Sequence, residues 1–320
     1  MTLTFDEAPD LEDIRERYGS ADAAVRRVAI MDLIDAGEDE EGIALAVSAL
    51  SDADHSVRAE AAMVLNEFQG EAVIAALLEA LGDEDAGVRE AAAESLAENK
   101  DPAAGPAILA RLDHPDAFIK AACLRALRDL RLPEGQGAGL AGLGHEDPAV
   151  RREAVGVLAY LRSDEVLLAL MDAARNDPDP HVRRVGVGSL IYSRTGQAAQ
   201  AVVHALTDDN WQVREEAAFI AGKVGDVAAV PALVEAMGDD YWQVRVKAAA
   251  SLGVLKDPAA VPVLGQALSF NISNLRKEAA AALGEIASED ARPFLEAASK
   301  DVDPDVRKVA RWAIGRIDAA

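Results

Sequence analysis

The fold is decided by a stretch that occurs twice in succession, DDNWQVREEAAFIAGKVGD at 208–226 and DDYWQVRVKAAASLGVLKD at 239–257. A shorter apolar segment follows each copy, AAVPALVEAM at 228–237 and AAVPVLGQAL at 259–268. All four segments space their apolar residues as amphipathic helices do. Each copy therefore predicts a pair of packed helices, which we call helix A (AVPALVEAM-like) and helix B (VRxxAAxxLG-like).

The same unit extends outward in both directions along the 320-residue chain. A basic residue follows an apolar residue near the start of every predicted helix B, at intervals of 31 or 32 residues: Arg26, Arg58, Arg89, Lys120, Arg151, Arg183, Arg214, Arg245, Arg276 and Arg307. One helix pair cannot bury its own apolar face, whereas stacked pairs share a continuous core. The sequence predicts an all-α fold, a right-handed α-solenoid of about ten 31-residue helix hairpins.

Helix B has a core face and a small-residue face. Counted from the apolar residue before the basic one, apolar side chains recur at positions 0, +4, +8 and +11, which in the second quoted copy are Val244, Ala248, Leu252 and Leu255. These positions share one side of a helix and should pack on helix A. Small residues at +5 and +9, here Ala249 and Gly253, should let neighbouring B helices approach closely.

Turn residues support these boundaries. An aspartate before proline gives a side-chain acceptor at the N-cap and a ring that suits the first helical position, at Asp147-Pro148, Asp179-Pro180, Asp257-Pro258 and Asp303-Pro304. The regular Arg at +1 predicts a ladder in which each guanidinium pairs with a turn carboxylate of its own or the neighbouring repeat. The candidate partners are Asp52, Asp83, Asp177, Asp208, Asp239 and Asp301.

The pattern VRxxAAxxLGxxxDxxAVPxLxxAL, which begins at Val244 and recurs from Val213, resembles the short HEAT-like repeat of phycobilisome-lyase subunits and of many bacterial interaction proteins. The resemblance covers about residues 20–317. It implies a helical-repeat fold, and it leaves the function open because such repeats serve unrelated tasks.

Charge and composition limit the classes of partner that the chain is expected to bind. The chain carries a net charge of −24, and residues 1–115 hold 27 acidic and 8 basic side chains against 29 and 24 in the rest. This charge disfavours nucleic-acid and anionic membrane partners and favours basic or neutral ones. The single cysteine, Cys123, falls at a core position, which predicts a buried and unreactive thiol. With no secretory signal and no apolar span, we expect a monomeric cytoplasmic protein.

A glycine-rich segment, LPEGQGAGLAGLG at 132–144, stands where a helix A is expected. Each glycine lowers helix stability by about 1 kcal/mol relative to alanine, so we expect a weak and partly irregular segment there. It also predicts a joint that separates the acidic repeats one to four with their N-terminal cap, residues 1–131, from repeats five to ten, residues 132–320.

No chemical motif indicates catalysis. GxSxG, HExxH and P-loop patterns are missing, and the GxGxxG of Gly137, Gly139 and Gly142 follows no predicted strand. His114 and His145 occupy equivalent turn positions in adjacent repeats, about 8–10 Å apart, which is too far for two ligands of one zinc ion. We therefore expect no catalytic residue, no cofactor and no metal site.

A partner is expected on the face of helix B opposite its core, which lines the concave surface in HEAT-like proteins. In repeats seven and eight this face holds Trp211, Gln212, Glu215, Glu216, Phe219, Trp242, Gln243, Val246 and Lys247. Exposed aromatics beside charges are typical of interface hot spots. Alternatively, the two tryptophans pack across the turns and stabilise the stack.

A second candidate surface combines Arg152 and Arg184 with Tyr160 and Tyr192, and it would bind an acidic peptide or an anion. The alternative is a solvated face whose tyrosines wedge between B helices. The leading hypothesis is a scaffold or adaptor for a protein or peptide client, with a basic client as one option. The alternative is an assembly factor resembling a phycobilin lyase subunit, which presents a client for cofactor attachment.

Overall fold

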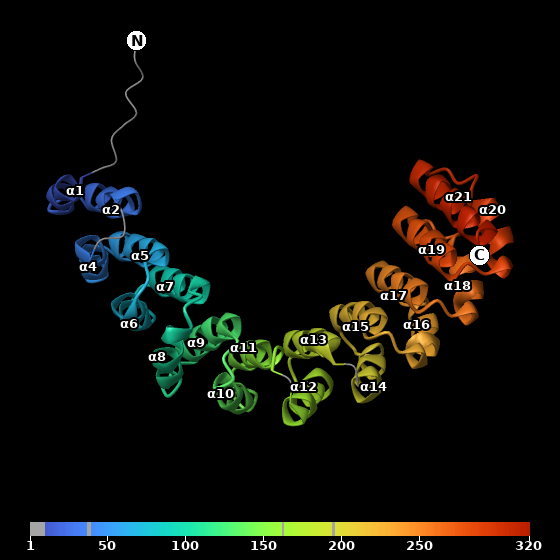
Figure 1. Ribbon diagram of the computed structural model, residues 1–320, viewed down its shortest axis with the longest axis horizontal. Helices are drawn as coiled ribbons and strands as arrows, with labels where there is room; N and C mark the ends of the chain where they lie inside the picture. Colours follow the sequence, from blue (N-terminus) through green and yellow to red (C-terminus); the bar gives the residue numbers. More distant parts are fainter. Residues whose placement is uncertain (1–9, 37–39, 162, 194–195) are drawn as a thin grey trace, which may run out of the picture. The chain divides into compact units, whose positions relative to one another are not determined.

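The computed structural model describes residues 10–36, 40–161, 163–193 and 196–320. Within these ranges all regular structure is helical and there is no strand, so the all-α prediction is confirmed. The chain forms two compact units, Met1–Leu161 and Arg162–Ala320. In each unit the A and B helices alternate along the chain and each B helix packs beside the next, as in a solenoid (Figure 1).

Unit 1 comprises α1 (Leu11–Tyr18), α2 (Ala23–Met31), α3 (Leu33–Ala36), α4 (Glu40–Ala49), α5 (His55–Val64), η1 (Leu65–Glu67), α6 (Glu71–Ala80), α7 (Ala86–Glu98), η2 (Pro102–Ala104), α8 (Gly105–Arg111), α9 (Ala117–Leu130), α10 (Gly135–Gly142) and α11 (Pro148–Leu158). Its B helices are α2, α5, α7, α9 and α11. The helices α4, α6, α8 and α10 occupy the A positions behind them.

Unit 2 comprises α12 (Asp164–Asn176), α13 (Pro180–Ser189), η3 (Leu190–Tyr192), α14 (Gly196–Ala205), α15 (Trp211–Val224), η4 (Val227–Ala229), α16 (Val230–Ala236), α17 (Trp242–Leu255), η5 (Pro258–Ala260), α18 (Val261–Ala267), α19 (Ser273–Ile286), η6 (Glu289–Ala291), α20 (Arg292–Ala298) and α21 (Pro304–Asp318). Its B helices are the odd-numbered ones from α13 to α21. The even-numbered helices form the other layer (Figure 1).

The core follows the predicted positions. Val244, Ala248 and Leu252 are fully buried, and Leu255 is half-buried. A Cβ at Gly253 would lie 2.8 Å from the Ala282 backbone, so glycine at +9 is what lets α17 and α19 approach this closely. The small-residue interface between B helices is therefore confirmed.

The predicted helix caps are present. The carboxylates of Asp147, Asp179 and Asp303 accept backbone N–H groups at the starts of α11, α13 and α21, and Asp257 does the same for η5. Each satisfies an amide that the helix itself leaves without a partner. The turns before these helices are thereby fixed by local hydrogen bonds.

The arginine ladder joins neighbouring repeats at several junctions within the two units. In five repeats the guanidinium binds both oxygens of an aspartate one repeat later: Arg26–Asp52, Arg58–Asp83, Arg183–Asp208, Arg214–Asp239 and Arg276–Asp301, at 2.6–3.1 Å. In each case its remaining Nη1 donates to a carbonyl of its own turn. Such bidentate charged hydrogen bonds hold successive turns in register.

The glycine-rich segment is more regular than predicted. Residues 135–142 form the helix α10, so the expectation of an irregular segment is wrong for this stretch. A Cβ at Gly139 would lie 2.8 Å from Leu158, and one at Gly142 would lie 2.8 Å from the Ala154 Cβ. These glycines let α10 pack directly against α11, and this packing offsets their low helix propensity. The joint at 132–144 stays a prediction.

A left-handed residue ends several B helices, and it yields a test of the backbone. The C-cap is Gly225 in α15 but Ala287 in α19, where φ is +53°. A side chain disfavours this conformation, whereas glycine adopts it readily. We expect Ala287→Gly to raise the free energy of unfolding by about 1 kcal/mol in urea titrations.

The reciprocal substitution is its control, because a Cβ at Gly225 would meet no atom within 4 Å. Gly225→Ala should therefore lower the free energy of unfolding through backbone strain alone. If both substitutions changed the free energy of unfolding in the same direction, this explanation of the C-caps would be contradicted.

The ladder predicts a pH dependence. The hydrogen bond from Arg58 is the main cause that lowers the pKa of Asp83, and partial burial opposes it. A lowered folded pKa contributes stability above the unfolded value of about 3.9, and this contribution is lost as the pH falls through the folded value. Asp83→Asn should cost about 1–2 kcal/mol at pH 7 and much less below pH ~3.

Urea midpoints measured between pH 2.5 and 7 check this, with Glu94→Gln, an exposed carboxylate on α7, as the control. A stability difference between wild type and Asp83→Asn that does not change with pH would rule out the charged pair as its source.

Candidate protein-binding surface

The residues predicted to bind a partner in repeats seven and eight lie on α15 and α17, which pack side by side in unit 2 (Figure 1). A Cβ at Gly222 would lie 2.5 Å from the Ser251 Oγ, and this hydroxyl donates to the buried Ala218 carbonyl. The two helices are thus held in a fixed register. Their outward residues form one surface, which we call the B face. It comprises Trp211, Gln212, Glu215, Glu216 and Phe219 on α15, Trp242, Gln243, Val246 and Lys247 on α17, and Glu278 on α19.

Trp211 and Trp242 behave differently although they occupy equivalent positions. The Trp211 indole is half-buried and stacks on the ring of Tyr241, with centroids 5.0 Å apart and an interplanar angle of 8°. Trp211 therefore does pack across a turn, as the alternative interpretation predicted. Trp242 is 40% exposed, so this indole is accessible to a partner.

Phe219 is the second accessible aromatic residue of the B face. Its ring is 38% exposed and lies 5.4 Å from the Lys223 Nζ and 5.3 Å from the Lys247 Nζ. Cation–π attraction holds both ammonium groups near the ring. The result is an aromatic side chain flanked by positive charge, on a helix face that the stack does not cover.

Two half-buried carboxyl groups lie at the position that Lys247 occupies in its own repeat, Glu216 on α15 and Glu278 on α19. Burial raises the pKa of Glu216, opposed by the charge of Arg184, and burial likewise raises the pKa of Glu278. Neither forms an ion pair within 4.0 Å among the described side chains. Because desolvation disfavours the ionised form, a cation from a partner would stabilise both carboxylates.

The remaining predicted residues of this surface are partly accessible. Gln212, Glu215, Gln243 and Val246 are all half-buried. The Gln243 Oε1 is buried and accepts no hydrogen bond from the described residues. A buried amide oxygen without a donor is costly, so a rotation toward a partner's N–H would be favourable.

The second predicted surface is not formed within either unit. Arg152 belongs to α11 of unit 1, where it contacts Glu153 at 3.2 Å, whereas the exposed Arg184 belongs to α13 of unit 2. The Arg131 guanidinium lies over the Tyr160 ring, 4.3 Å from the ring centroid. An acidic peptide or anion site at Arg152 and Arg184 stays a prediction.

Sequence reasoning missed Tyr241 and Phe270. Tyr241 takes the N-cap position of α17, which Asp or Asn fills in most B helices, and its side chain caps no amide. Phe270 stands where an aspartate pairs with the arginine in other repeats. The Arg245 guanidinium lies over its ring instead, 5.0 Å from the ring centroid. An aromatic residue at a position that is polar elsewhere was the signal that could have found them.

The chemical predictions concern metals, membranes and the thiol. Among the described residues, no three His, Cys, Asp or Glu side chains group closely enough to hold a metal ion. Cys123 is fully buried as predicted, and burial raises the pKa of its thiol to about 12. No helix in the described ranges has the length and apolar character of a membrane span.

Comparison with known proteins supports the repeat reading. A family model of HEAT repeats matches residues 11–97, 43–128, 138–191, 169–250 and 230–315. No curated protein matches the chain in sequence.

Among solved structures, an engineered protein is 21% identical with a TM-score of 0.52, over 97% of this chain and 99% of its own. Yeast importin-β, Kap95p, is 14% identical with a TM-score of 0.64, over 96% of this chain and 50% of its own. This chain thus spans about half the length of Kap95p. A further Kap95p structure, with the same identity, score and coverage, concerns its binding to RanGDP. At these identities the likeness shows the fold alone.

Proposed function

This chain belongs to the HEAT-repeat family, and on that basis we propose that it is a protein-interaction scaffold whose client binds the B face of unit 2. The observation that carries the proposal is the pair of accessible aromatics, Trp242 and Phe219, on packed helices that bury their opposite sides. Rigid aromatic side chains surrounded by polar residues supply most of the binding energy in many interfaces. Kap95p, an importin-β of similar fold, binds a protein, RanGDP, which is in line with this proposal.

The client's chemistry follows from the charges of the B face. Glu216 and Glu278 are half-buried and form no ion pair within 4.0 Å among the described residues, although the charge of Lys247 acts on both, and the accessible Trp242 and Phe219 lie on the same face. A client segment with an apolar anchor and a flanking Lys or Arg fits both features. Lys247, Gln212, Glu215, Gln243 and Val246 form the rest of the proposed contact surface, on the concave side in the HEAT-like arrangement.

The proposal is one of binding and includes no catalytic step. The assembly-factor alternative, resembling a phycobilin lyase subunit, stays a prediction because no observation in the described residues favours it. The monomeric state, cytoplasmic location and lack of nucleic-acid binding likewise stay predictions that rest on the sequence and its charge.

The test compares clients captured by the wild type and by Phe219→Ala/Trp242→Ala from a lysate of the source cells, with photo-crosslinking from position 246. Removing two hot-spot aromatics should weaken client binding about 30-fold or more, which corresponds to 2 kcal/mol or more. Phe294→Ala is the matched control, because this phenylalanine is 37% exposed but lies on an A helix, α20.

A client lost with the double variant and kept with Phe294→Ala supports the surface. Capture that is the same for all three proteins would remove the site assignment.

A further inference from the structure

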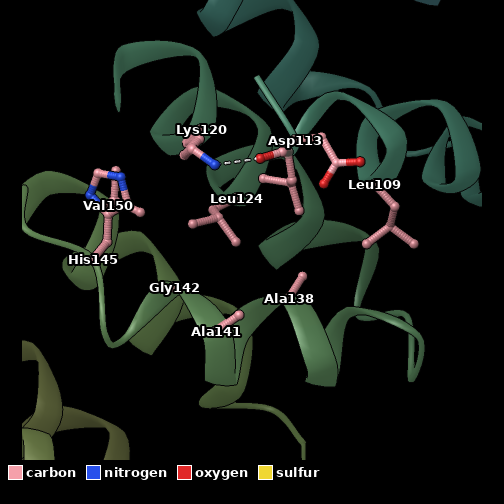
Figure 2. Close-up of a pocket in the computed structure, with 10 residues that line it drawn as sticks. Leu109, Asp113, Lys120, Leu124, Ala138, Ala141, Gly142, His145 and Val150 are labelled. Atoms are coloured by element: carbon pink, nitrogen blue, oxygen red, sulfur yellow. Dashed lines mark hydrogen bonds between the residues drawn. The ribbon is translucent and has the colours of Figure 1, made fainter. Parts of the chain in front are cut away.

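A cavity of about 340 Å³ lies in unit 1, between α8, α9, α10 and the turn that precedes α11 (Figure 2). Its apolar lining is Leu109, Leu112, Leu124, Ala138, Ala141, Gly142 and Val150, and its polar lining is Asp113, Lys120 and His145. The volume falls in the range of sites for small molecules, about 300–1,000 Å³. This cavity shares no residue with the B face of unit 2.

The cavity exists because α10 carries no large side chain toward it. On the side of α10 that faces α11 and not the cavity, Gly139 stands at the position that Leu233, Leu264 and Leu295 fill in the A helices of unit 2, where all three are fully buried. The α10 backbone therefore packs against α11 through glycine. Toward α8 and α9 it offers only Ala138, Ala141 and Gly142 (Figure 2). The space between these helices is left open.

The arginine ladder is also replaced at this junction. The basic residue is Lys120 instead of arginine, and the residue one repeat later is His145 instead of aspartate. The Lys120 Nζ donates to the Leu112 carbonyl at 2.6 Å and forms no ion pair with the described carboxylates. Its other two hydrogens are available. The Lys120 ammonium thus has no carboxylate within 4.0 Å among the described residues, in contrast to the paired arginines of the ladder.

His145 adds a second donor. Its Nδ1 accepts the backbone N–H of Asp147 at 3.0 Å, the same task that Asp83 performs for the Asp85 N–H in its own turn. The hydrogen of the ring must then reside on Nε2, which makes that atom a donor. His145 itself lines the cavity, so both polar groups on this side offer hydrogen-bond donors.

Asp113 supplies the opposite charge. Figure 2 shows His145, Lys120 and Asp113 along one side of the cavity, with Ala138 and Ala141 on the other side and Leu124 between them. The Asp113 carboxylate is exposed and forms no ion pair with the described residues. The rim thus offers donors for a carboxylate and an acceptor for an ammonium group, above an apolar floor.

We propose that this cavity binds a free apolar α-amino acid of the size of leucine or phenylalanine. The ligand carboxylate accepts from Lys120 and His145, the ligand ammonium donates to Asp113, and the apolar side chain contacts Leu109, Leu124 and Val150. This assignment uses every polar group in the lining. A lysine, a histidine and a glycine-rich helix meet at this junction, and local departures from a repeat pattern are expected at functional positions.

Calorimetric titration of the full chain with L-leucine and L-phenylalanine tests the proposal. For a ligand of this size we expect a dissociation constant of about 0.1–1 mM. Two analogues of leucine test the charged contacts separately: 4-methylpentanoate lacks the ammonium group, and 3-methylbutylamine lacks the carboxylate. Each should bind at least tenfold more weakly than leucine, because each leaves one side of the rim without a partner.

Variants locate the binding. Lys120→Met and Asp113→Asn should each weaken leucine binding at least tenfold, and Ala138→Leu should abolish it by filling the cavity. Ala107→Leu is the matched control, since it adds the same side chain at the equivalent position of α8, where alanine is exposed and outside the cavity. Circular dichroism checks that every variant is folded.

Three results would overturn the proposal. The first is no heat of binding from either amino acid at 10 mM, ~tenfold above the highest expected dissociation constant. The others are leucine binding that survives Ala138→Leu, and equal affinity for leucine and 4-methylpentanoate. The last would indicate a site for plain carboxylates. None of these outcomes bears on the B face, because its residues belong to unit 2.

Discussion

Burial between neighbouring helices is the constraint on which this structure depends. Its α-helices run from 4 to 15 residues, and isolated helices of such length are marginal in water. They become stable only when apolar positions such as Val244 and Leu252 are covered by the adjacent A helix and the adjacent repeats. In α15, α17 and α19 the glycine at +9 sets how close the next B helix comes, as Gly253 does against Ala282.

A second layer of polar interactions fixes the turns, and two of its exceptions lie at candidate sites. Where arginine and aspartate pair, as in Arg58–Asp83, the turn is a rigid joint between repeats. Where the pattern fails, other chemistry is present: Tyr241 replaces a capping residue beside Trp211, and Lys120 and His145 replace the ionic pair beside the unit 1 cavity. Departures from a local rule are expected at functional positions, where stability is given up for binding.

The architecture was predictable because its cause is periodic. The recurrence of an apolar–basic pair every 31 or 32 residues predicts the helix pairs, their core face and the Arg–Asp ladder. The behaviour of α10 was not, because helix propensity counts the cost of Gly139 but not the close packing on Leu158 that glycine permits.

The candidate surface was only partly accessible to the same reasoning. A helical wheel places Trp211 and Trp242 alike, and only the neighbouring turn decides that one stacks on Tyr241 while the other stays exposed. The cavity in unit 1 was missed altogether, since a void is defined by side chains that are absent from several helices at once.

The most direct test of neighbour-dependent stability is native-state hydrogen exchange on Gly253→Val. The added side chain must force α17 away from Ala282. In a solenoid each repeat contacts only its neighbours, so we predict lost amide protection in α17, α19 and the A helices packed on them, with unchanged protection in unit 1. Protection lost equally along the whole chain would show a single cooperative core and would contradict this account.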